Sequence, residues 1–218
     1  MSNIIQKYED IINLIKSKLE NKNKKIPKVI AVSKTFKLDK ILPLINYGHL
    51  DYGENKVQEA LEKWAEIKEK KANLKLHLIG KLQTNKVKQA IKIFDFVHSV
   101  DNKKLAKKIA DEQIKQNKKI KIFIQLNLGE EDQKSGVNKN NLLDLYNYCK
   151  ELNLNVIGLM CIPPFEENSE KYFKEMKVLN EKLNLSDLSM GMSSDYLKAV
   201  ENSATYLRIG SNIFGSRD

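Results

Sequence analysis

Lys34 and Arg208 are the two residues of this 218-residue chain whose chemical type and position could support chemistry. Lys34 follows the apolar run KVIAVS (28–33), and an amine desolvated at such a point can condense with an aldehyde. Arg208 is one of only two arginines among 38 basic residues, which leaves 36 lysines. Lys34 alone therefore assigns no function. Arg208 can only donate hydrogen bonds, either to a ligand or within a structural salt bridge at a rim.

Two glycine- and serine-containing segments near the carboxyl end are typical of phosphate-binding loops. They read SMGMSS (189–194) and RIGSNIFG (208–215). Gly191 and Gly210 allow close approach of the backbone to a ligand. Ser193 can cap a following helix and can also donate its hydroxyl. Ordinary helix capping and a tight turn would explain the same residues, but two such segments in succession favour a phosphate site.

The remaining titratable residues give weaker indications. The three histidines lack the spacing of metal ligands, so no metal site is expected. Glu54 and Glu59 flank Asn55 and could form an acid–base pair, although carboxylates at helix N-termini are common because of the helix dipole. Cys149 and Cys161 form neither a metal motif nor a disulfide pattern, which favours a reducing, cytoplasmic location.

Eight short apolar runs alternate with amphipathic stretches, and they would position these residues. The runs lie at 28–33, 50–55, 74–80, 94–100, 119–127, 155–162, 188–192 and 205–210. Helices are predicted over 3–20, 57–70, 102–116, 140–152 and 169–183, with weaker ones from Leu38, Asn85 and Ser194. Eight βα units of about 27 residues predict an α/β fold: a (β/α)₈ TIM barrel with an extra N-terminal helix. A doubly wound open sheet is the alternative.

The composition of the chain bears on whether nucleic acids or membranes are its partners. The net charge of +10 invites a nucleic-acid partner, but the lysines are dispersed along the predicted helices and arginine is almost absent. We therefore expect no nucleic-acid binding. The chain has no apolar run long enough to span a membrane and no linker composition, so we expect one domain over residues 1–218 and no membrane partner.

In such a barrel the carboxyl ends of the strands form the functional face. The residues predicted at those ends are Lys34, Asn55, Gly80, Asn127, Met160, Gly191 to Ser193 and Arg208 to Ser211. The sequence therefore predicts that the lysine, the arginine and the two glycine-containing segments meet at one rim.

Seven motifs in order resemble the pyridoxal phosphate homeostasis protein family. They are AVSKT (31–35), YGENKVQEA (52–60), HLIGKLQTNK (77–86), KSGV (134–137), GLMCIP (158–163), LSMGMSSDYLKAV (188–200) and RIGSNIFGSRD (208–218). That family is similar to the N-terminal barrel of alanine racemase, the type III fold of enzymes that use pyridoxal 5′-phosphate (PLP). Leu78, where an aromatic is frequent, and Ser211, where threonine is frequent, depart from the family pattern.

The resemblance implies a role for each site residue. Lys34 would form a Schiff base with PLP, and Arg208 would face the pyridine nitrogen and hold it unprotonated. Ser193, Gly210 and Ser211 would hold the phosphate. Asn55 and His77 would line the pocket, and Met160 would lie against the cofactor ring. Lys37 or Lys81 could capture the aldehyde at a second, weaker site.

The resemblance also implies the function: binding PLP and buffering or delivering it in vitamin B6 homeostasis, without an established reaction. PLP-dependent apoenzymes would be the partners. A racemase or decarboxylase remains the alternative, because the same pocket would serve it. The chain ends soon after its eighth predicted strand, so we expect no second domain, no second catalytic base, and a monomer.

Overall fold

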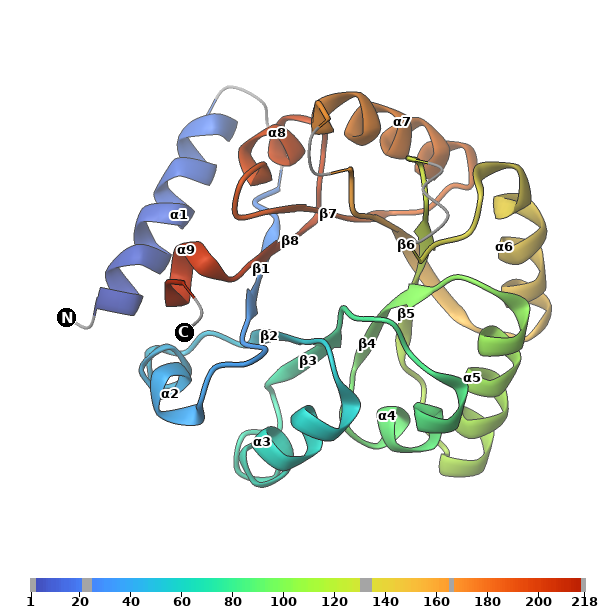
Figure 1. Ribbon diagram of the computed structural model, residues 1–218, viewed down its shortest axis with the longest axis horizontal. Helices are drawn as coiled ribbons and strands as arrows, with labels where there is room; N and C mark the ends of the chain where they lie inside the picture. Colours follow the sequence, from blue (N-terminus) through green and yellow to red (C-terminus); the bar gives the residue numbers. More distant parts are fainter. Residues whose placement is uncertain (1–2, 21–24, 130–134, 165–166, 217–218) are drawn as a thin grey trace.

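Eight parallel strands close into a barrel in the computed structural model, which describes residues 3–20, 25–129, 135–164 and 167–216 (Figure 1). The strands follow one another around the barrel in chain order: β1 (Lys28–Val32), β2 (Asp51–Glu54), β3 (Lys75–Leu78), β4 (Phe96–Val100), β5 (Lys121–Leu126), β6 (Asn155–Cys161), β7 (Asp187–Met192) and β8 (Tyr206–Ile209). Ala31 lies opposite Tyr52 of β2 and opposite Ile209 of β8, which closes the ring. The predicted (β/α)₈ barrel is confirmed.

The helices form a ring outside the strands (Figure 1). Their bounds are α1 (Asn3–Leu19), α2 (Leu38–Tyr47), α3 (Val57–Lys70), α4 (Val87–Ile93), α5 (Lys103–Gln116), α6 (Leu142–Glu151), α7 (Ser169–Lys182), α8 (Tyr196–Glu201) and α9 (Ser211–Phe214), with 3₁₀ turns η1 (Thr84–Lys86) and η2 (Lys139–Asn141). The short helix α9 was not anticipated, because four residues are too few to show a helical period.

Helix α3 illustrates the apolar spacing from which the helices were predicted. Its buried residues Val57, Ala60 and Trp64 are spaced by three and four positions, so they form one stripe that faces the strands. At the start of α5, Asn102 accepts a hydrogen bond from the backbone of Leu105, and the helix ends at Asn117 in the left-handed conformation. Such caps satisfy backbone groups that a helix end would otherwise leave unpaired.

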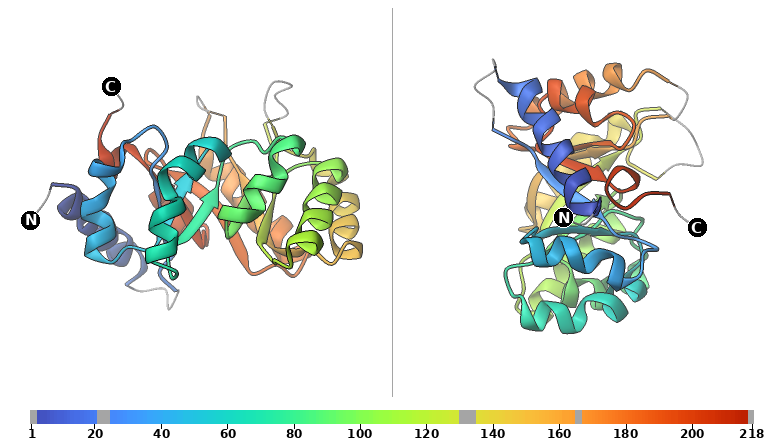
Figure 2. Two further views of the ribbon diagram at one scale, coloured as in Figure 1. Left: turned by 90° about the horizontal axis from the view of Figure 1, so that it is seen from below. Right: turned by 90° about the vertical axis from the view of Figure 1, so that its left-hand side faces the viewer.

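Helix α1 precedes the first strand and packs against α2, α8 and α9, burying Ile11, Ile15 and Leu19. Figure 2 shows α1 and α2 at one end of the molecule and α5 and α6 at the other. The extra N-terminal helix predicted from the sequence is therefore present, and it covers the seam where β1 meets β8.

A separate cluster of buried side chains fills the barrel interior. Its apolar members are Ile30, Phe96, Phe123, Met160 and Tyr206. Two buried histidines stack against its aromatic rings: the centroids of His77 and Phe96 are 4.2 Å apart, and those of His98 and Phe123 are 4.3 Å apart. The interior is thus a packed layer that contains polar rings, as opposed to a channel.

Candidate functional site

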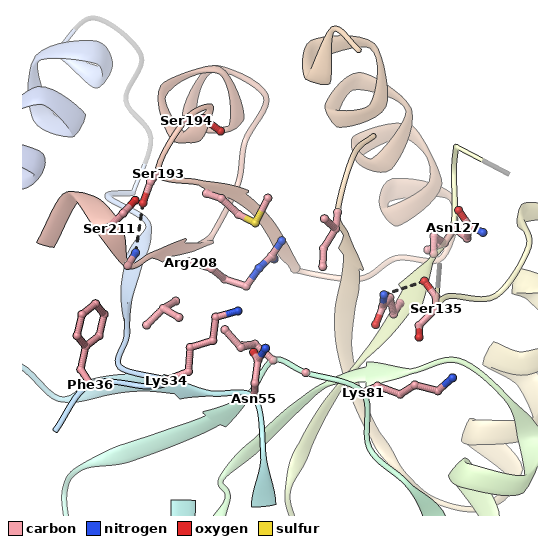
Figure 3. Close-up of a pocket in the computed structure, with 18 of the residues that line it drawn as sticks. Lys34, Phe36, Asn55, Lys81, Asn127, Ser135, Ser193, Ser194, Arg208 and Ser211 are labelled. Carbon is pink, nitrogen blue, oxygen red and sulfur yellow. Dashed lines mark hydrogen bonds between the residues drawn. The ribbon is translucent and has the colours of Figure 1, made fainter. Parts of the chain in front are cut away.

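A cavity of about 860 Å³ opens at the carboxyl ends of the strands (Figure 3). Residues from seven of the eight strands or from the loops that follow them line it, including the ends of β1, β5 and β8. This is the face at which barrel enzymes place their sites, because the loops after the strands converge there. Figure 3 shows the Lys34 side chain extending into the cavity towards the Arg208 guanidinium.

Six of the eight residues expected at the site line this cavity: Lys34, Asn55, Ser193, Arg208, Gly210 and Ser211. They come from segments up to 177 positions apart in the chain, from Lys34 to Ser211. Their meeting is a consequence of barrel closure, which brings β8 beside β1. The expectation that the lysine, the arginine and the two glycine-containing segments share one rim agrees with this geometry.

His77 and Met160, which were expected to line the pocket, lie in the barrel interior and are absent from the lining of this cavity. His77 precedes the end of β3, and Met160 lies one residue before the end of β6. Both side chains are fully buried, and Met160 packs with the aromatic cluster. Residues just beyond the strands, Ile79 and Ile162, line the cavity in their place.

Backbone contacts on both sides of Lys34 hold the turn that carries it. The Ser33 carbonyl accepts a hydrogen bond from Lys63 Nζ at 2.9 Å. The Thr35 amide donates to Glu59 Oε1 at 2.7 Å, and Thr35 has the left-handed backbone angle φ of 69°. A β-branched residue adopts that conformation only when its surroundings enforce it. The position of Lys34 is therefore imposed by α3.

Glu54 anchors the same turn from below. Its carboxylate Oε1 accepts from Ser33 Oγ at 2.8 Å, from Trp64 Nε1 at 2.9 Å and from Lys63 Nζ at 3.1 Å. Burial raises the pKa of Glu54, and these three donors oppose the rise. Neither Glu54 nor Glu59 lines the cavity. The two carboxylates thus serve to position the lysine turn, and the acid–base pair considered from the sequence is not formed at the cavity.

The two glycine-containing segments are tied together by Ser193. Its hydroxyl oxygen accepts from the backbone amides of Gly210 at 3.3 Å and Asn212 at 3.4 Å, and Asn212 Nδ2 donates to the Ser193 carbonyl at 2.9 Å. Gly191 has φ of +90°, and a Cβ there would lie 2.6 Å from Cβ of Ala199. Serine hydroxyls, small residues and backbone amides are the groups that bind phosphate in such loops.

Arg208 lies at the floor of the cavity and is 4% exposed. Its Nη1 donates to Ser189 Oγ at 2.6 Å and its Nη2 donates to the Cys161 carbonyl at 2.8 Å. Within the described part of the chain, no carboxylate lies within ion-pair distance of this guanidinium, so the alternative of a rim salt bridge is not realised. A guanidinium has five N–H donors, and these two bonds leave others for a ligand.

Several lining residues were not identified from the sequence: Phe36, Gln125, Ser135 and Ile162. Of the two lysines considered for a second, weaker site, Lys81 lines this same cavity and Lys37 does not. Gln125 lies within β5, and its amide donates to the Ser135 carbonyl at 2.8 Å. That contact could not be inferred from sequence spacing, because it depends on how the following loop folds back. Lys134 of the KSGV motif lies outside the described residues.

The buried His77 and His98 and the partly buried His49 predict an acid-sensitive fold. Burial lowers the pKa of His49, His77 and His98. Between the lowered folded-state pKa and the unfolded value of about 6.5, the unfolded chain binds more protons, so acid favours unfolding. Each histidine then lowers the free energy of unfolding by up to about 1.4 kcal/mol per pH unit as the pH falls below about 6.5. The raised pKa of Glu54 acts in the opposite direction near and above pH 4.5.

Denaturant unfolding measured from pH 7.5 to pH 5 checks this expectation. The free energy of unfolding should stay level above pH 6.5 and fall below it. The variant His49→Gln should lose one histidine's share of the slope, because His49 is one of the three histidines that burial affects. A free energy of unfolding that does not change between pH 6.5 and pH 5 would contradict the prediction.

Comparison with known proteins places this architecture in a family. The alanine racemase N-terminal domain family matches residues 9–218. The pyridoxal phosphate homeostasis protein of Aquifex aeolicus is 42% identical over 200 residues, covering 87% of each chain. The protein of the same name from Escherichia coli K12 is 34% identical over 200 residues, covering 87% of this chain and 86% of the relative. The chain belongs to the pyridoxal phosphate homeostasis protein family.

Solved structures agree with that membership. The structure of PipY of Synechococcus elongatus with PLP bound has a TM-score of 0.85 and 30% identity, covering 98% of this chain and 100% of that chain. Alanine racemase from Acinetobacter baumannii, with a TM-score of 0.71 and 18% identity, shares the fold and covers 95% of this chain and 60% of its own. In the described part of this family member, no helix is both long enough and apolar enough to cross a bilayer. The same residues hold no group of three potential metal ligands.

Proposed function

We propose that this protein binds PLP in the cavity at the strand ends, attaches it covalently to Lys34, and holds it for buffering or delivery to other proteins. The observation that carries the proposal is the pairing of Lys34 with Arg208 across one cavity that also receives the two glycine-containing segments. The family name of the relatives and the PLP in PipY support the choice of ligand.

The residues present fit this cofactor. A cavity of about 860 Å³ is within the range that encloses small cofactors. PLP supplies an aldehyde that condenses reversibly with an amine, together with a phosphate and a pyridine ring. Lys34 would supply the amine, Arg208 would donate to the ring nitrogen, and Ser193 and Ser211 would donate to the phosphate. Asn55 lines the same wall as Lys34 and would orient the cofactor.

Holding is favoured over catalysis by the groups that line the cavity. Among the described lining residues, the charged or titratable side chains are Lys34, Lys81 and Arg208. None of them is a carboxylate, histidine, tyrosine or cysteine, so the general bases that the lining offers are the two lysines, of which Lys34 would carry the cofactor. Arg208 keeps its proton and would leave the pyridine nitrogen unprotonated, which weakens the ring as an electron sink. A racemase or decarboxylase would therefore have to use Lys81 as its free base.

Cofactor transfer tests the proposal. The protein is loaded with PLP, desalted, and mixed with the apo form of a PLP-dependent aminotransferase, with and without a phosphatase that destroys free PLP. We expect aminotransferase activity to recover in both mixtures. In a third mixture, free PLP at the same concentration replaces the loaded protein, and with the phosphatase present it should restore less activity. The loaded protein alone should not racemise or decarboxylate a panel of amino acids faster than free PLP does. Turnover of one amino acid would favour the enzyme instead, and failure to load would remove the proposal.

A further inference from the structure

A continuous series of five side chains crosses the barrel from the cavity to the opposite end. Arg208 Nη1 donates to Ser189 Oγ at 2.6 Å, and this oxygen lies 2.8 Å from His98 Nδ1. His98 Nε2 lies 3.0 Å from His77 Nδ1. His77 Nε2 lies 2.9 Å from Asp51 Oδ1. We call Arg208, Ser189, His98, His77 and Asp51 the barrel chain. Arg208 lines the cavity, and Asp51 is the first residue of β2, at the amino ends of the strands.

The two ends of the barrel chain determine where its protons lie. A guanidinium only donates and an ionised carboxylate only accepts. Ser189 therefore accepts from Arg208 and turns its own hydrogen to His98 Nδ1. His98 must then carry its proton on Nε2 and donate it to His77 Nδ1. His77 in turn carries its proton on Nε2 and donates it to Asp51. All four contacts are satisfied in this single direction with both imidazoles neutral.

The reverse direction leaves groups unsatisfied. If His77 donated from Nδ1, a neutral ring would present its bare Nε2 to the Asp51 carboxylate, and two acceptors would face each other 2.9 Å apart. Giving His77 a second proton would instead place an imidazolium in a fully buried position. Ser189 would then accept from both neighbours, and its own proton would have no hydrogen-bonded acceptor among the described residues. A buried unsatisfied hydroxyl and a buried extra charge are both costly.

The electrostatics of the buried groups agree with the neutral assignment. Burial lowers the pKa of His77 and lowers that of His98 still further, and the nearby Arg208 charge adds to the effect on His98. Although burial opposes it, the hydrogen bond from His77 holds the pKa of Asp51 below its usual value. Asp51 is thus an anion, with a side chain that is 17% exposed. Lys28 is a further positive group near it.

The barrel chain cannot serve as a proton wire to the cavity. Passing a proton along it would require Arg208 to release or accept one, and a guanidinium does neither in a protein. The five hydrogen-bonded side chains can instead hold the guanidinium in one orientation. Two of its donors are then committed, and the remaining ones keep a constant direction at the cavity floor.

We propose that Asp51 acts through Ser189 and two neutral histidines to fix the direction in which the Arg208 guanidinium donates into the cavity. Asp51, His77, His98 and Ser189 are then positioning residues of the site, although none of them lines the cavity. The effect of these residues on PLP binding rests on the proposed function. The positions of the protons along the barrel chain do not depend on it.

The proton arrangement is measured on the protein without added ligand. Long-range ¹H–¹⁵N spectra of selectively labelled histidine report which ring nitrogen carries the proton. We expect His77 and His98 both to be neutral with the proton on Nε2 throughout the neutral pH range. A proton on Nδ1 of either ring, or a charged ring, would overturn the assignment. This result does not depend on whether the protein binds PLP. A wrong proton assignment in the barrel chain can therefore be distinguished from a wrong proposed function.

The role in binding is measured with Asp51→Asn, which preserves shape and removes the charge. The matched control is Asp187→Asn, because Asp187 is the first residue of β7 at the same end of the barrel and bonds Ser186. We expect Asp51→Asn, in which a neutral Oδ1 can still accept from His77, to disturb the His77 signals and to weaken PLP binding about fivefold, the difference between a charge-assisted and a neutral hydrogen bond. Equal PLP affinity of the two variants would overturn the proposal. If Asp51→Asn does not fold, the histidine spectrum of the unsubstituted protein decides.

Discussion

Replacing Lys34 with alanine should abolish covalent attachment of PLP while leaving the barrel folded. The attachment needs an amine, and Lys34 extends into the cavity towards Arg208 from a turn that α3 holds in place. Lys34 is half-buried, so the stability cost of its removal should stay within about 1 kcal/mol. The visible absorption band of loaded protein should disappear, and borohydride treatment followed by peptide mass mapping should find no adduct.

Lys81→Ala is the matched control for this experiment, because Lys81 is a second lysine that lines the same cavity. The control should keep both the absorption band and an adduct on the peptide that contains Lys34. Weak binding should survive in Lys34→Ala, since Arg208 and the segments joined by Ser193 remain. A band that persists in Lys34→Ala, or an adduct mapped to Lys81, would contradict the assignment of Lys34.

Replacing Gly80 with alanine should have the largest effect on the framework of the site. A Cβ on Gly80 would lie 2.4 Å from the carbonyl oxygen of Asn55 and 2.9 Å from its Cα. Both are backbone atoms, so the ends of β2 and β3 would have to separate. Overpacking of this kind costs about 3 kcal/mol, which for a chain of this length lowers the melting temperature by roughly 6–12 °C. Because Gly80 and Asn55 both line the cavity, PLP affinity should fall as well.

Gly215→Ala is the control, since Gly215 lines the same cavity but has open space around the added atom. Its φ of +89° makes alanine unfavourable there, at a cost of roughly 1 kcal/mol. Thermal unfolding and PLP titration of the two variants give the comparison. Equal melting temperatures would show that the contact between Gly80 and the Asn55 backbone does not constrain the rim.

Local patterns in the amino-acid sequence were enough to predict the order of the elements and the residues at the rim. Eight apolar runs at regular spacing can bury their side chains only as parallel strands covered by the intervening helices. Residues at or directly after the ends of those runs, such as Asn55 and Lys34, must then lie at the carboxyl ends. Arg208 lies within β8, and it was identified because arginine is rare in this chain. Local pattern and residue type are sufficient for this, because each is read within a few positions of the chain.

The contacts between side chains within the barrel could not be predicted from the sequence. Strand alternation says that a residue faces inward, but not how deep it lies. His77 and Met160, which the family resemblance implied for the pocket wall and the cofactor ring, lie in the barrel interior. The contact between His98 and Ser189 joins residues 91 positions apart, and no periodicity predicts it. Barrel closure, strand stagger and packing set such contacts. For that physical reason the barrel chain became visible only in three dimensions.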